Sequence, residues 1–466
     1  MNANQHRLDR VTASDLFLLM WDDYGWSSDI GGLAILDGAA LLDHHGRLQI
    51  DSLRSQLAAK LHLVPRFRQL LLRPRTGLGW PLWVDAPSFD IADHVRLHPV
   101  EQPGDERALL QACQHLAGKP LDPTRPLWEL WLLPGLSEGR VGAFLRLHHA
   151  VADGTTALAA FGALLDPSPE PPTHAPPAPW LPTPIPTAGA LLRDNVIRRS
   201  QQLVRAGAAL AHPSRTLRQA KQATPAWREV LTEQPAPSTS LNQPVGDRRL
   251  LAVVRSRLDD SKRIAHSHDA KVNDVVLTAV AGGLRALLAS RGEDVNGLVQ
   301  RAMVTISEHR ERSAETQGNK PGWMMVPLPL GEPAPLRRLQ LIAAETKARK
   351  HRARPEAASG IFRFVAAQRL WYRRFAQQRS VNLVVTNVPG PPVPLYLNGA
   401  RVLETFPVMP TMGNLTLVVA ALSYDGQLNI TAAADRSACP DVEVFAQGVR
   451  ATLDVLAQDR EPAVFR

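Results

Sequence analysis

The sequence predicts a mixed α/β protein of two lobes joined by a crossover segment. Its 466 residues exceed the roughly 100–200 of one ordinary domain, and a hydrophobic fraction of 44% is enough to bury a large core. Short apolar runs alternate with helical patterns before residue 165, and the same texture returns after about residue 248. Between these regions, ten of the 39 prolines fall within residues 167–186, which excludes a helix interior or a central strand there.

The elements of each lobe follow from the spacing of apolar residues. In the first lobe we predict strands over 33–36 and 141–145 and a helix over 109–117. In the second lobe we predict a strand over 250–254, a helix over 275–288 that is apolar nearly all round, and buried strands over 382–386 and 415–422. The predicted division is an N-terminal lobe over 1–165, a proline-rich and basic crossover over 166–245, and a C-terminal lobe over 246–466.

Positive charge is concentrated in two segments of the chain. The formal net charge is +9, while residues 187–230 carry a net +6 and residues 337–379 a net +10. Within the second segment, residues 361–375 have apolar residues at helical spacing with arginines on the other side. Such a helix suits a membrane surface, although packing against a core is the commoner use of the pattern. No nucleic-acid binding motif accompanies the charge, so we expect no nucleic-acid partner.

The cysteine and histidine pattern excludes two ways of stabilising the chain. Cys113 and Cys439 are the only cysteines, and neither a Cys-x-x-Cys pair nor a histidine cluster at ligand spacing is present. We therefore expect no disulfide scaffold, no metal and a reducing, cytoplasmic compartment. The first residues lack an apolar signal region, and no window approaches the ~18 consecutive apolar residues of a spanning helix, so we expect any membrane contact to be peripheral.

One run of residues points to chemistry. A predicted strand ends in His148 and His149, and a short turn then leads to Asp153 and Gly154. The end of a strand can aim an imidazole into a cleft, and an imidazole that titrates near neutral pH suits a general base. The spacing His-His-x-x-x-Asp-Gly arises by chance only rarely, so it is a moderately specific signal.

With this run the sequence resembles the bacterial wax ester synthase/diacylglycerol acyltransferase family, and the resemblance extends over almost the whole chain. In the first lobe it includes Pro65-Arg66-Phe67-Arg68, Pro120-Leu121-Asp122 and Arg125-Pro126-Leu127-Trp128-Glu129. In the second lobe it includes Val272-Asn273-Asp274, Gly318-Asn319, Asn387-Val388-Pro389-Gly390, Ser423-Tyr424-Asp425-Gly426 and Ala434-Asp435-Arg436. The resemblance implies two chloramphenicol-acetyltransferase-like lobes, each a mixed β-sheet with flanking helices, and an active site at the lobe interface.

The resemblance also implies roles for individual residues. His149 would be the general base that takes the proton from an alcohol as its oxygen attacks the thioester of acyl-CoA. His148 would orient the end of the strand, and Asp153 would brace the site through an arginine, for which Arg436 is one candidate. Asn273 is a candidate donor to the oxyanion, with the cap of the following helix as its alternative role.

The implied reaction uses acyl-CoA as co-substrate, with diacylglycerol or a long-chain alcohol as acceptor and no further cofactor. Its products would be triacylglycerol or wax ester, and a membrane or lipid-droplet surface would be a peripheral partner. Two alternatives stay open. One is amide formation as in condensation domains, which share His-His-x-x-x-Asp-Gly, and the other is a catalytically idle lipid-binding protein of the same fold.

Overall fold

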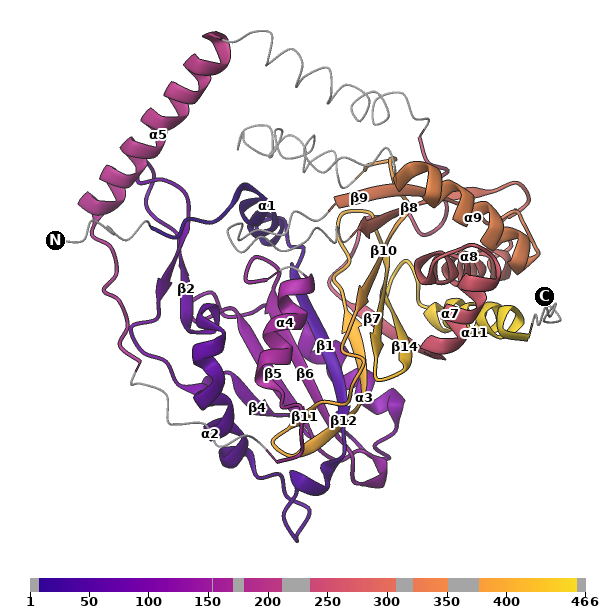
Figure 1. Cartoon of the computed structure of the whole chain (residues 1–466), viewed down its shortest axis with the longest axis horizontal. Helices are drawn as coiled ribbons and strands as arrows, with labels where there is room; N and C mark the ends of the chain where they lie inside the picture. Colours follow the sequence, from indigo (N-terminus) through magenta and orange to yellow (C-terminus); the bar gives the residue numbers. More distant parts are fainter. Residues whose placement is uncertain are drawn as a thin grey trace, which may run out of the picture.

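Two six-stranded sheets form the body of the protein in a computed structural model (Figure 1). The structure describes residues 8–152, 154–170, 180–211, 235–306, 322–350 and 377–458. The first sheet has the strand order β11-β12-β1-β6-β5-β4, and the second has the order β7-β14-β13-β10-β8-β9. Both sheets mix parallel and antiparallel pairs, which confirms the predicted α/β class with two sheet-containing lobes.

The first lobe is built from the N-terminal part of the chain. Its helix α1 begins with a reciprocal cap, because the Thr12 hydroxyl accepts from the amide of Asp15 and the Asp15 carboxylate accepts from the amide of Thr12. Helices α2 and α4 pack against each other beside the first sheet, and α3 lies against β6. The elements are α1 (Ala13–Asp22), β1 (Asp29–Leu36), α2 (Ile50–Lys60), β2 (Gln69–Leu72), β3 (Leu82–Asp85), β4 (Val95–Leu97), α3 (Glu106–Ala117), β5 (Trp128–Leu133), β6 (Val141–His148) and α4 (Gly154–Leu164).

The second lobe also combines a six-stranded mixed sheet with flanking helices, and one of these helices is buried. Helix α8 packs between α11 and α9, and most of its residues are fully buried, as its apolar sequence predicts. It is the one described helix long and apolar enough to cross a membrane, yet 72% of its apolar window is buried inside the lobe. The elements are β7 (Arg249–Arg257), α7 (Leu258–Ser267), α8 (Val272–Ser290), β8 (Val299–Ile306), β9 (Gly322–Pro329), α9 (Pro335–Lys350), β10 (Leu383–Pro389), β11 (Tyr396–Leu397), β12 (Ala400–Val408), β13 (Leu417–Tyr424), β14 (Gln427–Asp435) and α11 (Val442–Gln458).

Strands β11 and β12 cross from the second half of the chain into the first sheet. Strand β12 pairs antiparallel with β1, so that Leu33 lies opposite Phe406 and Gly31 opposite Val408. Figure 1 shows this arm as an orange and yellow segment beside the indigo β1. Leu33 and Phe406 also share one hydrophobic cluster with Val253 of β7, so the two lobes have a continuous buried interface. The exchange of strands was not predicted, and the boundaries at 165 and 245 stay predictions.

The crossover segment is anchored at its start and then leads to a long helix. Asp166 exchanges two backbone hydrogen bonds with Tyr396 of β11, and its carboxylate accepts a 2.7 Å hydrogen bond from the buried Lys60 ammonium. Residues 180–187 carry no regular secondary structure, as the prolines require, and α5 (Ala188–Ala211) follows. The amphipathic run predicted over 361–375 lies outside the described residues.

Candidate active site

The predicted general base follows the central strand of the first sheet. Strand β6 lies between β1 and β5, and all eight of its residues are buried. Its apolar side chains alternate between the first core and the lobe interface, and the strand ends at His148. His149 is half-buried, and its backbone amide donates to the carbonyl of Ser28 at 2.9 Å. The backbone of His149 is therefore held at the end of the sheet where β6 ends and β1 begins.

Both ring nitrogens of His148 are engaged, which fixes its tautomer. Its Nδ1 accepts a 3.0 Å hydrogen bond from the amide of Ala150. A backbone amide can only donate, so the ring proton of neutral His148 is on Nε2, which donates to the carboxylate of Asp22 at 2.9 Å. Because the ring is only 3% exposed and held at both nitrogens, His148 is suited to orienting the strand end. Asp22, the last residue of α1, was not singled out from the sequence.

Asp153 lies outside the described residues, so its bracing role remains a prediction. Arg436, the arginine suggested as its partner, follows β14 and is exposed. The turn between the two histidines and α4 is described up to Ala152, whose side chain is buried in the first core together with Val151.

Asn273 begins the helix that fills the second lobe. It is half-buried in the first turn of α8, whose principal neighbours are α7, α9, α11, β9 and β10 of the same lobe. The helix is capped by Asp274 instead, because its carboxylate accepts from the amide of Lys271 at 2.8 Å and from the hydroxyl of Thr346 at 2.8 Å. The oxyanion role of Asn273 therefore stays a prediction.

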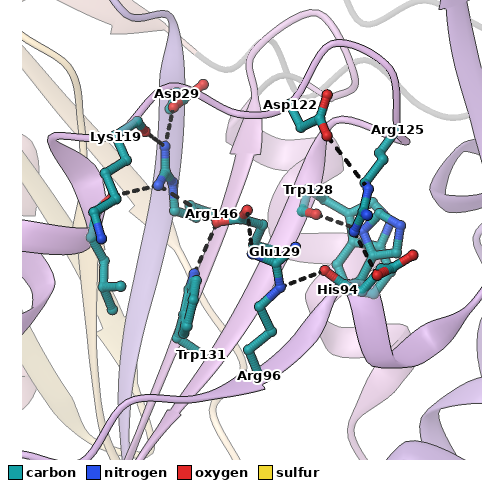
Figure 2. Close-up of polar contacts among 12 residues, drawn as sticks. Asp29, His94, Arg96, Lys119, Asp122, Arg125, Trp128, Glu129, Trp131 and Arg146 are labelled. Carbon is teal, nitrogen blue, oxygen red and sulfur yellow. Dashed lines mark hydrogen bonds and ion pairs between the residues drawn. The ribbon is translucent and has the colours of Figure 1, made fainter.

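A row of alternating charges crosses four neighbouring strands next to the histidines (Figure 2). Arg146, two residues before His148, donates to the carboxylate of Asp29 on β1 at 2.6 Å and lies 3.6 Å from that of Glu129 on β5. Glu129 in turn lies 3.5 Å from Arg96 of β4. Arg146 also donates to the carbonyl oxygens of Leu116 and Lys119, at the end of α3 and just beyond it. This charged row is absent from the sequence predictions, although a charged residue in an otherwise apolar buried strand was a visible signal.

The Pro126-Leu127-Trp128-Glu129 motif supplies one member of this row, Glu129, next to a tightly packed tryptophan. Trp128 is 1% exposed, stacks on Phe67 and His94 at ring distances of 4.6 and 4.7 Å, and donates from Nε1 to the carbonyl of Phe67. Burial lowers the pKa of His94, whose Nδ1 lies 2.8 Å from the carbonyl oxygen of Trp128. The motif is thus a packed structural unit, as its proline and tryptophan suggested.

The Asn-Val-Pro-Gly and Ser-Tyr-Asp-Gly motifs lie in the second lobe, where one of them contacts the arm β11-β12. The hydroxyl of Tyr424 donates to the carbonyl of Val402 on β12 and accepts from the amide of Leu395. Gly390 packs so closely that a side chain there would lie 2.2 Å from the carbonyl oxygen of Ser423. The Asn-Val-Pro-Gly and Ser-Tyr-Asp-Gly motifs are therefore neighbours in space, and the second of them holds the arm through Tyr424.

A small pocket, with room for about one water molecule, lies where the lobes meet. It is lined from the first lobe by Asp29, Phe144 and Arg146 and from the second lobe by Arg249 and Val408, among others. Burial lowers the pKa of the Arg249 guanidinium. Since Asp29 is the cross-strand neighbour of His148, this pocket reaches the pair of strands that carries the predicted base.

Comparisons with known proteins agree with this arrangement. Residues 11–276 match the family model of the wax ester synthase/diacylglycerol acyltransferase catalytic domain, and residues 317–457 match that of the WS/DGAT C-terminal domain. A probable diacylglycerol O-acyltransferase of Mycobacterium tuberculosis is 32% identical over 441 residues, covering 90% of this chain and 89% of its own. A second protein of that organism, a putative diacylglycerol O-acyltransferase, is 28% identical over 467 residues, covering 97% and 90%.

Solved structures show the same fold. The wax ester synthase/diacylglycerol acyltransferase from Marinobacter aquaeolei superposes with a TM-score of 0.69 at 24% identity, covering 96% of this chain and 99% of its own. The first condensation domain of the calcium-dependent antibiotic synthetase superposes with a TM-score of 0.60 at 18% identity, covering 97% of each chain. Condensation domains thus share the architecture, while the family models separate this chain from them. The chain belongs to the wax ester synthase/diacylglycerol acyltransferase family, and it is an acyltransferase.

Proposed function

We propose that this enzyme transfers a fatty acyl group from acyl-CoA to the hydroxyl group of diacylglycerol, of a long-chain alcohol, or of both. The family match and the names of the relatives support O-acylation. The observation that carries the proposal is the position of His149, half-buried directly after the central strand β6, whose Phe144 and Arg146 line the pocket between the lobes. The proposed reaction requires no cofactor and no metal besides the acyl-CoA co-substrate.

In the proposed mechanism His149 moves a single proton. It takes the proton of the acceptor hydroxyl as that oxygen attacks the thioester carbonyl carbon, and a tetrahedral oxyanion forms. Collapse of this intermediate breaks the carbon–sulfur bond, and the proton on His149 passes to the departing CoA thiolate. His148 takes no part in the transfer, because its two nitrogens are held by Ala150 and Asp22. Asn273 and Asp153 keep their proposed roles as oxyanion donor and structural brace.

The decisive experiment replaces the base. We expect His149→Ala to lower CoA release from palmitoyl-CoA and dioleoylglycerol by about 10²–10⁴-fold, the usual contribution of a general base. The matched control is His266→Ala, since His266 is exposed on α7 and belongs to the other lobe. Full activity of the His149→Ala enzyme would overturn the mechanism.

A panel of acceptors assigns the substrate. Labelled acyl-CoA offered with diacylglycerol, monoacylglycerol and long-chain alcohols separates triacylglycerol synthesis from wax ester synthesis by the polarity of the product. An amine acceptor and a carrier-bound acyl donor test the amide-forming alternative. Binding of neutral lipid without turnover of any donor would instead favour the idle lipid-binding protein.

We also propose a cytoplasmic enzyme that meets its apolar acceptor at a membrane or lipid-droplet surface. Both cysteines are buried and carry free thiols, which suits a reducing compartment. Burial raises the pKa of the Cys439 thiol to about 12, so this group stays protonated and unreactive at neutral pH. A diacylglycerol or a long-chain alcohol is concentrated in lipid, and peripheral contact would bring the enzyme to it.

A further inference from the structure

Helix α5 leaves the first lobe with an apolar face exposed. Its first half is held to the body on one side, where the carboxylate of Asp194 accepts from Arg10 at 2.9 Å and the side chain of Asn195 donates to the carbonyl of Gly77. Leu191 on the same side is only 5% exposed. Figure 1 shows the C-terminal half of α5 leading away from both sheets.

The side opposite these contacts carries two apolar stripes, with Arg193 and Ser200 between them. Leu192, Val196 and Leu203 are 50%, 57% and 73% exposed, and their spacing of four and seven residues places them on one stripe. Ile197 and Val204, 44% and 71% exposed, form a neighbouring stripe seven residues apart. Exposed apolar side chains gathered on one face mark an interaction surface.

The charge on α5 indicates what this surface meets. The only acidic residue of α5 is Asp194, which faces the body, whereas Arg193 and Arg199 are exposed beside the apolar stripes. Two apolar stripes with Arg193 between them and Arg199 at their border, and with no outward carboxylate on α5, fit an anionic lipid surface. A second copy of the chain fits poorly, because pairing of two such faces would bring like charges together.

We propose that the exposed face of α5, formed by Leu192, Val196, Ile197, Leu203 and Val204 with Arg193 and Arg199, docks the enzyme on a lipid surface that contains anionic headgroups. The apolar side chains enter the interface between headgroups and acyl chains, and the arginines contact phosphates. The inference rests on the proposed function only in its reason for docking, which is access to an apolar acceptor. It gives two arginines of the crossover segment, Arg193 and Arg199, a specific role on the molecule.

Sedimentation with vesicles of phosphatidylcholine, with and without phosphatidylglycerol, tests the proposal on the full-length protein. We expect Leu203→Ser with Val204→Ser to lower the partition coefficient roughly tenfold on both kinds of vesicle. We expect Arg193→Glu with Arg199→Glu to lower it at least roughly thirtyfold on the anionic vesicles only, since each basic residue near such a surface contributes about a factor of five and the glutamates add repulsion.

Matched controls keep the test specific. Val455→Ser removes a valine that is 50% exposed on α11, and Arg107→Glu with Arg337→Glu changes the net charge equally at exposed sites on α3 and α9. Both controls should bind vesicles like the wild type. Equal vesicle binding by the α5 variants and the wild type would overturn the proposal, as would a wild-type dimer that Leu203→Ser with Val204→Ser dissociates without loss of vesicle binding.

Activity separates this proposal from the proposed reaction. With a short, water-soluble alcohol as acceptor, the α5 variants should keep wild-type turnover, because α5 is distant from β6 in the fold. The His149→Ala enzyme should bind vesicles normally while losing turnover. If the docking proposal fails, the His149→Ala enzyme will still lose turnover. If the proposed reaction fails, the α5 variants will still bind vesicles less than the wild type.

Discussion

Replacement of Arg146 by methionine should destabilise the protein more than any loss of a surface ion pair. The Arg146 side chain is 2% exposed and that of Asp29 is 8% exposed, so the substitution removes the guanidinium that is hydrogen-bonded to a buried carboxylate. It also removes the donor to the carbonyl oxygens of Leu116 and Lys119. Breaking a buried pair by removing one partner costs about 3–5 kcal/mol, and we expect a loss of unfolding free energy of that size.

Arg125 provides a matched control in the same region. It also contacts two carboxylates, those of Asp93 at 2.6 Å and Asp122 at 3.4 Å, but all three side chains are 39–47% exposed (Figure 2). Solvent-exposed ion pairs contribute about 0–1 kcal/mol, so Arg125→Met should shift the free energy of unfolding by no more than that. Urea unfolding, followed by tryptophan fluorescence and far-ultraviolet circular dichroism, measures both variants.

A second substitution tests whether the cause is electrostatic. Asp29→Asn removes the charge that Arg146→Met leaves unpaired, so the double variant should be more stable than the sum of the two single effects predicts. Two results would refute the reasoning. The Arg146→Met protein could unfold at the same urea concentration as Arg125→Met, or the effects of Asp29→Asn and Arg146→Met could be strictly additive in the double variant.

Three further predictions concern single side chains around the site. Burial lowers the pKa of His94 in the native state, so below about pH 6.5 the unfolded state binds more protons and native stability falls as pH falls. His94→Gln should therefore make the stability measured in thermal melts less dependent on pH in this range. An unchanged pH dependence would exclude this residue as the cause. Tyr424→Phe should cost about 1–3 kcal/mol in urea unfolding, since it leaves buried groups of Val402 and Leu395 without their partner, and near-wild-type stability would contradict the role of this clamp. Asp22→Asn should lower kcat roughly tenfold with little change in KM, because an amide can present its nitrogen to His148 and disturb the ring; a shift confined to KM would speak against a positioning role.

Most of the fold could be predicted from the sequence because local patterns determine its elements. The strand predicted over 141–145 lies within β6, the helix over 275–288 lies within α8, and the strand over 250–254 lies within β7. The arm β11-β12 could not be assigned to the first sheet in this way. Its residues have the pattern of an ordinary strand, and which edge a strand joins depends on contacts far away in the chain, here between β12 and β1.

The site was predictable where the motif itself carries the chemistry. His148 and His149 stand at the end of a strand, as their apolar approach indicated. Asp22 and Asp29 could not be singled out, because an acidic residue near a helix end or a strand start usually faces solvent, and only the pairing of β1 with β6 brings Asp29 beside Arg146. Arg146 stands two residues before His148 in the sequence, yet its partners come from three different segments of the chain.

The exchanged arm ties the position of the predicted base to the second lobe. Strand β1 is held on one side by β6 and on the other by β12. Ser28, just before β1, contacts His149, and Asp29, its first residue, contacts Arg146. Without β12, the apolar strand β1 would be an open edge, which native sheets avoid. Tyr424, which holds β12 by a hydrogen bond to Val402, lies more than 200 residues from His149 in the sequence. We therefore expect the position of the predicted base to depend on a distant segment of the chain through β12 and β1.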